Sequence, residues 1–160
     1  MKIIYMHHAE RNIGKNHNDP QLRQLEDITE LGKKEAELLA ERLKNINVTA
    51  IVTSPYLRCK HTAEIINKFH NSPIIYDERF NEMNSNEEWE HLLKRNIAAI
   101  DDIVNSYEDD DTIICITSGV NFSAFVCYFY DIKPTNNVPW SQAGAISPIN
   151  FTIGKKKLDW

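Results

Sequence analysis

The sequence has few cysteines and lacks a long apolar run. The three cysteines, an odd number without C-x-x-C spacing, are Cys59, Cys115 and Cys127. They lie in segments with strand or helix character, which predicts reduced core residues. No window approaches the roughly 20 apolar residues of a membrane span, and the apolar stretch 3–6 is too short for a signal peptide. We therefore expect a cytoplasmic protein that does not bind membranes.

Positive charge is also scarce. The chain has 18 Lys and Arg residues against 23 Asp and Glu, which gives a net charge of −5. Proteins that bind nucleic acids hold phosphates with clustered Lys and Arg, and the one basic run, 155–157, is short. These counts argue against a nucleic-acid partner. What is present, 42% hydrophobic and 26% charged residues over 160 positions, is typical of one globular domain spanning 1–160.

Apolar runs and helical spacings alternate along the chain. Short apolar runs that end in polar residues predict strands at 3–6, 50–53, 74–76, 112–117 and 145–153. Apolar residues at helical spacing predict helices at 29–44, 57–69, 87–107 and 121–130. The segment 9–28 is rich in Asn, Asp, Gly and Pro and is predicted to be a loop. Such alternation predicts a three-layer α/β/α sandwich with a mostly parallel central sheet.

In a sheet of this kind, ligands bind beyond the carboxyl ends of the strands. This rule selects the junctions 7–10, 54–58 and 117–121. The first holds His7 and His8, and a neutral imidazole there could attack phosphorus or simply satisfy local hydrogen bonds. The second holds Arg58, in the first turn of a predicted helix, where its guanidinium could bind a phosphate.

Four segments, taken in order, resemble the histidine phosphatase (phosphoglycerate-mutase-like) superfamily. Residues 7–10 overlay the family's Arg-His-Gly-Glu, and residues 28–32 its Leu-Thr-x-x-Gly block. Residues 54–63 are similar to Ser-Pro-Leu-x-Arg-x-x-x-Thr-Ala, and residues 79–82 to the block that ends in a proton-donating glutamate. Four blocks in the right order are far more specific than any one of them.

The resemblance implies an activity and assigns roles. The chain would hydrolyse a small phosphorylated molecule through a phosphohistidine on His8. Arg58 would bind the phosphoryl oxygens, and Glu82 would donate a proton to the leaving group and later accept one from water. This chemistry requires no metal and no other cofactor.

Several positions depart from the family pattern. His7 replaces the arginine before the nucleophile, Ala9 replaces a glycine, and Ser118 stands, before Gly119, in the place of a second catalytic histidine. The predicted phosphate-binding set is therefore Arg58 with His7, Ser118 and Gly119. Removing one donor aimed at developing charge lowers a rate by about 100- to 1000-fold, which predicts low or altered activity.

Two alternatives stay open at this point. The first is a binding or regulatory protein on the same fold, which would hold a phosphorylated ligand without turning it over. The second is a metal site formed by His7, His8, Glu10 and His17. Adjacent histidines on an extended segment point to opposite faces, which disfavours joint chelation. The substrate, the choice between phosphatase and mutase, and the oligomeric state are not determined by the sequence.

Overall fold

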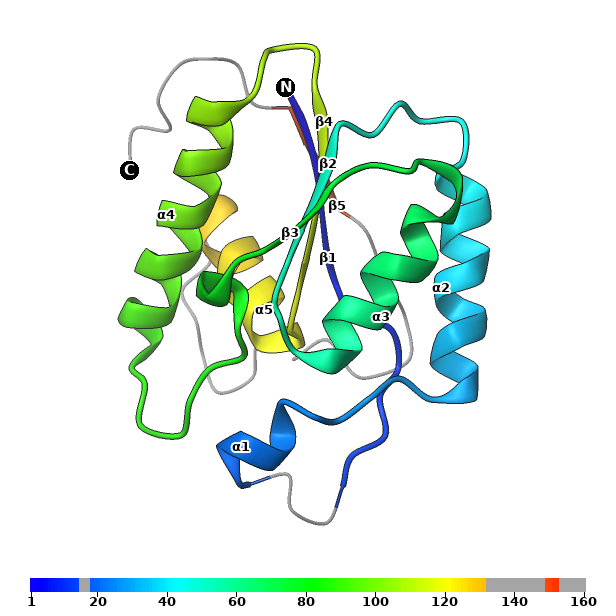
Figure 1. The fold of residues 1–160 in the computed structure, drawn as a ribbon. Coiled ribbons are helices and arrows are strands. Elements are labelled where there is room, and N and C mark those ends of the chain that lie inside the picture. Colours follow the sequence, from blue (N-terminus) through cyan, green and yellow to red (C-terminus); the bar gives the residue numbers. More distant parts are fainter. Residues whose placement is uncertain (15–17, 132–148, 153–160) are drawn as a thin grey trace.

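A central five-stranded sheet forms the middle layer of the computed structural model, which describes residues 1–14, 18–131 and 149–152. The strands are β1 (Lys2–His7), β2 (Ala50–Thr53), β3 (Ile74–Tyr76), β4 (Thr112–Thr117) and β5 (Ile149–Thr152). Their order is β3-β2-β4-β1-β5, and only β5 runs antiparallel to its neighbour (Figure 1). The predicted α/β sandwich with a mostly parallel sheet is confirmed. The ends of the predicted last strand, 145–148 and 153, lie outside the described residues.

The helices follow the predicted pattern with shifted ends. They are α1 (Pro20–Arg23), α2 (Glu30–Leu43), α3 (Leu57–Ile66), α4 (Trp89–Ser106) and α5 (Gly119–Phe129), with 3-10 turns at Asn67–Phe69 and Glu78–Phe80. The predicted loop 9–28 contains α1, which begins with a proline at its first position after the capping Asp19. Helix α1 could not be predicted, because it has only four residues and none of them is buried, so its sequence shows no helical periodicity.

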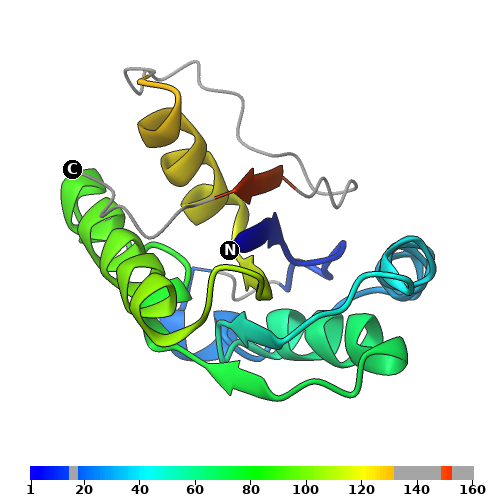
Figure 2. The same cartoon turned by 90° about the horizontal axis from the view of Figure 1, so that it is seen from above.

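Helices cover both faces of the sheet. Figure 2 shows α2 and α3 on one side and α4 and α5 on the other. Successive side chains of β1 point to opposite faces, so Ile3 and Tyr5 join the core beneath α4 and α5. Ile4 and Met6 join the core beneath α2 and α3. All four side chains are fully buried, which explains the continuous apolar run in this strand.

The cores contain the cysteines and one unexpected polar residue. All three cysteines are buried and free, as predicted. Asn96 lies on the buried face of α4, where the spacing predicted apolar residues only. It is satisfied there because Tyr5 Oη donates to its Oδ1 at 3.1 Å and its own Nδ2 donates to the Leu92 carbonyl at 2.7 Å. Within the described part of the chain, no helix has the length and apolar character needed to span a membrane.

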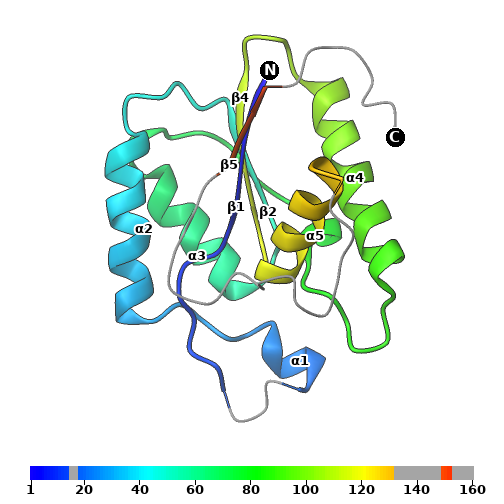
Figure 3. The same cartoon turned by 180° about the vertical axis from the view of Figure 1, so that it is seen from behind.

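The carboxyl ends of the central strands lie side by side. His7 at the end of β1 pairs with Thr117 at the end of β4, and Thr53 of β2 pairs with Ile116 of the same strand. Figures 1 and 3 show α1 lying beyond this end of the sheet. The three junctions selected from the sequence therefore meet at one edge, beneath α1.

Candidate active site

His8 lies just beyond the end of β1 and is almost fully buried. Its backbone N–H donates to the Thr117 carbonyl at 2.9 Å, which extends the pairing with β4 by one residue. Its Nδ1 lies 2.7 Å from the Ala9 carbonyl. Because a carbonyl oxygen only accepts, Nδ1 carries the proton of the neutral ring, and Nε2 keeps a lone pair. Nε2 is the nitrogen that can act as a nucleophile.

Burial lowers the pKa of His8 well below its ordinary value of 6.5, and the nearby Arg58 guanidinium lowers it further. The Ala9 carbonyl opposes this shift, while His7 and Arg11 add to it. At neutral pH the ring is therefore uncharged, the form in which imidazole is nucleophilic.

Helix α3 fixes the chain on both sides of the site. Thr62 Oγ1 accepts from the Ala9 N–H at 3.1 Å and donates to the Arg58 carbonyl at 2.7 Å. The threonine of the family-like segment thus connects the residue after His8 to the turn that carries Arg58. This contact explains why a threonine four residues after the arginine belongs to the pattern.

Arg58 is the largest fully buried side chain of the described residues. Its Nη1 donates to the Arg23 carbonyl at 2.8 Å, and its Nη2 donates to Glu82 Oε2 at 2.7 Å. Its guanidinium carbon lies 4.9 Å from the centre of the Tyr56 ring. Burial lowers the pKa of Arg58, while the neighbouring Glu82 carboxylate opposes that shift.

Glu82 follows the 3-10 turn Glu78–Phe80, and neighbouring strand ends hold this segment in place. Thr117 Oγ1 donates to the Phe80 carbonyl at 2.9 Å, and Ser54 Oγ donates to Asn81 Oδ1 at 2.6 Å. The Glu82 side chain thereby reaches the same edge of the sheet as Arg58.

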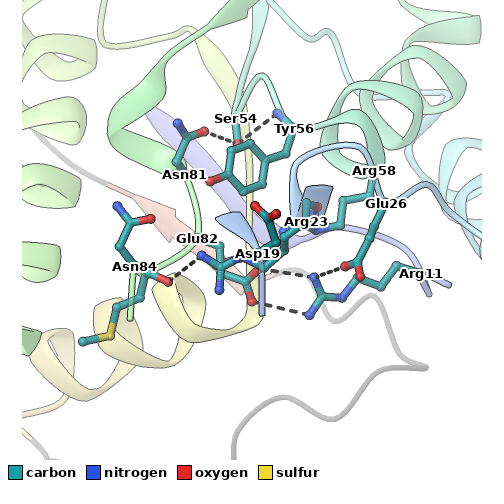
Figure 4. Close-up of polar contacts among 12 residues, drawn as sticks. Arg11, Asp19, Arg23, Glu26, Ser54, Tyr56, Arg58, Asn81, Glu82 and Asn84 are labelled. Atoms are coloured by element: carbon teal, nitrogen blue, oxygen red, sulfur yellow. Dashed lines mark hydrogen bonds and ion pairs between the residues drawn. The ribbon is translucent and has the colours of Figure 1, made fainter. Parts of the chain in front are cut away.

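Two further arginines surround Glu82. Arg11 donates from Nη1 to Glu82 Oε2 at 3.2 Å and to Glu26 Oε2 at 3.0 Å, and Figure 4 shows it between the two carboxylates. Arg23 Nε lies 3.8 Å from Glu82 Oε2. No role for Arg11 or Arg23 could be predicted from the sequence, because both lie in an aperiodic segment. An arginine in such a segment close to a nucleophile is the only available signal.

Ser118 caps helix α5. Its Oγ donates to Asn121 Oδ1 at 2.7 Å, and Asn121 Nδ2 donates to the Asn81 carbonyl at 2.9 Å. The hydroxyl proton of Ser118 is therefore directed at its own helix. Gly119 is the first residue of α5 and is half-buried. Contact of Ser118 or Gly119 with phosphate stays a prediction.

His7 is buried beside His8, with its Nδ1 at 2.6 Å from the His8 carbonyl. Its ring stands edge-on to the Phe122 ring, with 5.9 Å between the ring centres. Its predicted role at the phosphate stays a prediction. Among the described residues, no group of three His, Cys, Asp or Glu side chains is arranged to hold a metal ion, and His17 lies outside them.

The histidine, arginine and glutamate predicted from the sequence thus lie near one another at the carboxyl end of the sheet. The sequence pattern of the histidine phosphatase superfamily (branch 1) matches residues 6–93, more than half of the 160 residues. The chain belongs to this superfamily. The matched region contains His8, Arg58 and Glu82, and it ends before Ser118.

Similarity to individual proteins is more limited. Over 56 residues, the chain is 41% identical to a probable phosphoglycerate mutase, GpmB, of Photorhabdus laumondii. That stretch covers 35% of this chain and 26% of that protein's length. Bacillus stearothermophilus YhfR has a similar structure, with a TM-score of 0.79, 21% identity, and coverage of 93% of this chain and 89% of that one.

A phosphoserine phosphatase of Entamoeba histolytica, solved in complex with 3-phosphoglyceric acid, is also similar. Its TM-score is 0.73 at 18% identity, over 94% of this chain and 89% of that one. At identities this low, the TM-scores establish a shared fold and nothing more. The superfamily assignment rests on the sequence match over residues 6–93.

Proposed function

We propose that this protein hydrolyses small phosphate monoesters through a phosphohistidine on His8. The observation that carries the proposal is the state of the His8 ring, whose Nδ1 faces the Ala9 carbonyl while burial and Arg58 lower the pKa. Such a ring is neutral at physiological pH and holds its nucleophilic lone pair on Nε2.

The reaction would proceed in two steps. In the first, His8 Nε2 forms a bond to phosphorus, the bond from phosphorus to the ester oxygen breaks, and the Glu82 carboxyl gives its proton to the leaving alkoxide. In the second, the Glu82 carboxylate takes a proton from water as the water oxygen attacks phosphorus. The P–N bond then breaks, and inorganic phosphate, neutral His8 and protonated Glu82 remain.

Arg58 would stabilise the charge that develops on the phosphoryl oxygens. In the structure its Nη2 contacts Glu82, so an incoming phosphate would compete with this carboxylate for the guanidinium. The exchange would free Glu82 for proton transfer. The Entamoeba relative's complex with 3-phosphoglyceric acid supports small phosphorylated acids as the substrates to test first.

The direct test is hydrolysis of p-nitrophenyl phosphate and a panel of metabolite phosphates. The wild-type protein is compared with His8→Ala and with the control His70→Gln, whose position lies beyond the far end of α3 from Arg58. We expect turnover in the wild type and the control and its loss in His8→Ala. Turnover that is indifferent to His8→Ala would refute the proposal.

A non-catalytic phosphate-binding function is the second candidate. It is favoured by one observation, namely that the Ser118 hydroxyl already donates to Asn121, at the position where the family pattern has a histidine. Calorimetry distinguishes the two functions. Stable binding of an intact phosphate ester, with no product formed during the titration, would favour this second function over hydrolysis.

A further inference from the structure

Three guanidinium groups converge on a single oxygen atom, Glu82 Oε2. Arg58 Nη2 lies 2.7 Å from this atom, Arg11 Nη1 3.2 Å and Arg23 Nε 3.8 Å. The side chain of Arg58 is fully buried, and those of Arg11 and Arg23 are each 11% exposed. The three arginines come from two separate segments of the chain, and Figure 4 shows them gathered near the carboxylates of Glu82 and Glu26.

This cluster carries more positive than negative charge. Among the described residues, the carboxylates that form ion pairs with the three arginines are Glu26 and Glu82. Since buried charges are costly unless they are balanced, the excess of one positive charge favours an additional anion.

Two donors in the cluster also lack an acceptor. The Nε atoms of Arg58 and Arg23 are buried and have no hydrogen-bond partner in the described part of the chain. Buried guanidinium N–H groups are normally paired, so each of these atoms calls for an acceptor. The Arg58 side chain is fully buried, so water does not satisfy its Nε–H group. This missing acceptor points to a bound anion independently of the excess of positive charge.

We propose that Arg11 and Arg23 are phosphoryl-binding residues, acting together with Arg58. An incoming tetrahedral oxyanion would place one oxygen where Glu82 Oε2 now lies, and its other oxygens would accept hydrogen bonds from the Nε donors of Arg58 and Arg23, which now have no hydrogen-bond acceptor. The inference rests on the proposed phosphatase function and extends it. The segment between β1 and α2 would thus supply the positive charge that the family pattern places elsewhere.

The two substituted positions explain why this charge is needed. His7 Nδ1 contacts the His8 carbonyl, and the Ser118 hydroxyl donates to Asn121. Arg11 and Arg23 instead direct guanidinium groups at the carboxylate that Arg58 also binds. The positive charge of this site is therefore concentrated on the three arginines.

The test is the affinity for inorganic phosphate, measured by calorimetry at fixed ionic strength. We expect Arg11→Ala and Arg23→Ala each to weaken binding by about 10- to 100-fold, the loss of a hydrogen bond to a charged group. Arg42→Ala, an exposed arginine of α2, is the matched control and should leave binding unchanged. Wild-type affinity in both site variants would overturn the inference.

A variant that binds phosphate more tightly than the wild type cannot owe this change to misfolding. Glu26→Gln removes the carboxylate that competes for Arg11 and keeps an oxygen to accept from the Gly14 N–H, now at 2.9 Å. We expect this variant to bind phosphate several-fold more tightly, and the gain to vanish when Arg11→Ala is added. If the folded Glu26→Gln protein binds phosphate no more tightly than the wild type, the inference is wrong.

The two proposals fail in distinguishable ways. Phosphate binding that depends on Arg11 and Arg23, without His8-dependent turnover of any ester, would support the binding site and overturn the hydrolase. Conversely, His8-dependent turnover with a phosphate affinity that is indifferent to both arginines would support the hydrolase and overturn the binding role.

Discussion

At the scale of single residues, the reactivity that we propose for His8 depends on a ring that stays neutral. Burial is the main cause of its lowered pKa, and the Arg58 guanidinium is the second. Both causes disfavour a positive charge on the imidazole, so protonation is displaced to lower pH. The same environment that hides the ring from water keeps its Nε2 lone pair available at neutral pH.

We predict that His8 titrates well below 6.5 in the folded protein, as measured by NMR of the ring. Arg58→Met should raise the His8 pKa, because it removes the charge and leaves the burial. Since the folded pKa lies below the unfolded one, the contribution of His8 to stability is present above about pH 6.5 and is lost as the pH falls towards the folded pKa. A midpoint at or above 6.5 would contradict the assigned environment.

Ser118 offers a second test at the residue scale. Its hydroxyl donates to Asn121 Oδ1 and caps α5, so Ser118→Ala should lower the free energy of unfolding by about 1 kcal/mol. Phosphate affinity should change less than it does in Arg58→Ala. Urea unfolding and calorimetry measure the two effects. Equal losses of affinity in both variants would instead make Ser118 a phosphate ligand, as the family pattern implies.

The residues of the site were only partly predictable. His8, Arg58 and Glu82 each lie in a family-like segment, and two of them follow predicted strands, so their meeting at one edge could be expected. Arg23 could not be found, because nothing in an aperiodic segment says which way a side chain points. Its proximity to Glu82, 59 positions further along the sequence, exists only once the chain is folded.

At the scale of elements, the loop after β1 depends on its contact with α2. The Thr29 N–H donates to the Glu10 carbonyl at 3.0 Å, and Thr29 Oγ1 caps the helix by accepting from the Gly32 N–H. A Cβ on Gly32 would lie 2.2 Å from the Glu10 carbonyl oxygen. The glycine of the family-like segment is thus required because the backbone after His8 passes directly over it.

We predict that Gly32→Ala lowers the free energy of unfolding by about 1–3 kcal/mol, because a backbone atom must move to admit the methyl group. Gly14→Ala is the matched control, since among the described residues its Cβ would meet only the Glu26 side chain, at 3.6 Å. Denaturant unfolding of the two variants gives the comparison. Equal free energies of unfolding in the two variants would show that the backbone at Glu10 moves to admit the methyl group without loss of stability, contrary to this prediction.

The strands were easier to predict than the ends of the helices. The ranges 50–53, 74–76 and 112–117 match β2, β3 and β4, because short apolar runs between turn residues leave little choice. Helix α5 begins two residues before its predicted start, because Ser118 rather than a later residue caps it. The strand order had no signal, since alternating strands and helices are compatible with several orders.

At the scale of the whole molecule, the site exists because the sheet gathers distant segments at one edge. His8 follows β1, Arg58 begins α3 and Glu82 follows the 3-10 turn Glu78–Phe80, and Figure 1 shows these elements at the end of the sheet that faces α1. The strands β1, β2 and β4, which are buried on both faces, support the site, and the residues to which we assign the chemistry lie just beyond the strand ends. We propose that this arrangement transfers a phosphoryl group to His8.

Trapping the phosphoenzyme in Glu82→Gln tests this transfer most directly. The good leaving group of p-nitrophenyl phosphate needs little help from a proton donor, whereas hydrolysis of the intermediate needs the Glu82 carboxylate as a base. The Glu82→Gln protein is mixed with the ester, quenched rapidly, and analysed by peptide mass spectrometry. We predict an acid-labile phosphoryl group on His8, which should be absent from the double variant that also carries His8→Ala. Turnover of the ester with no phosphoryl group on His8, or with one on another residue, would contradict the account.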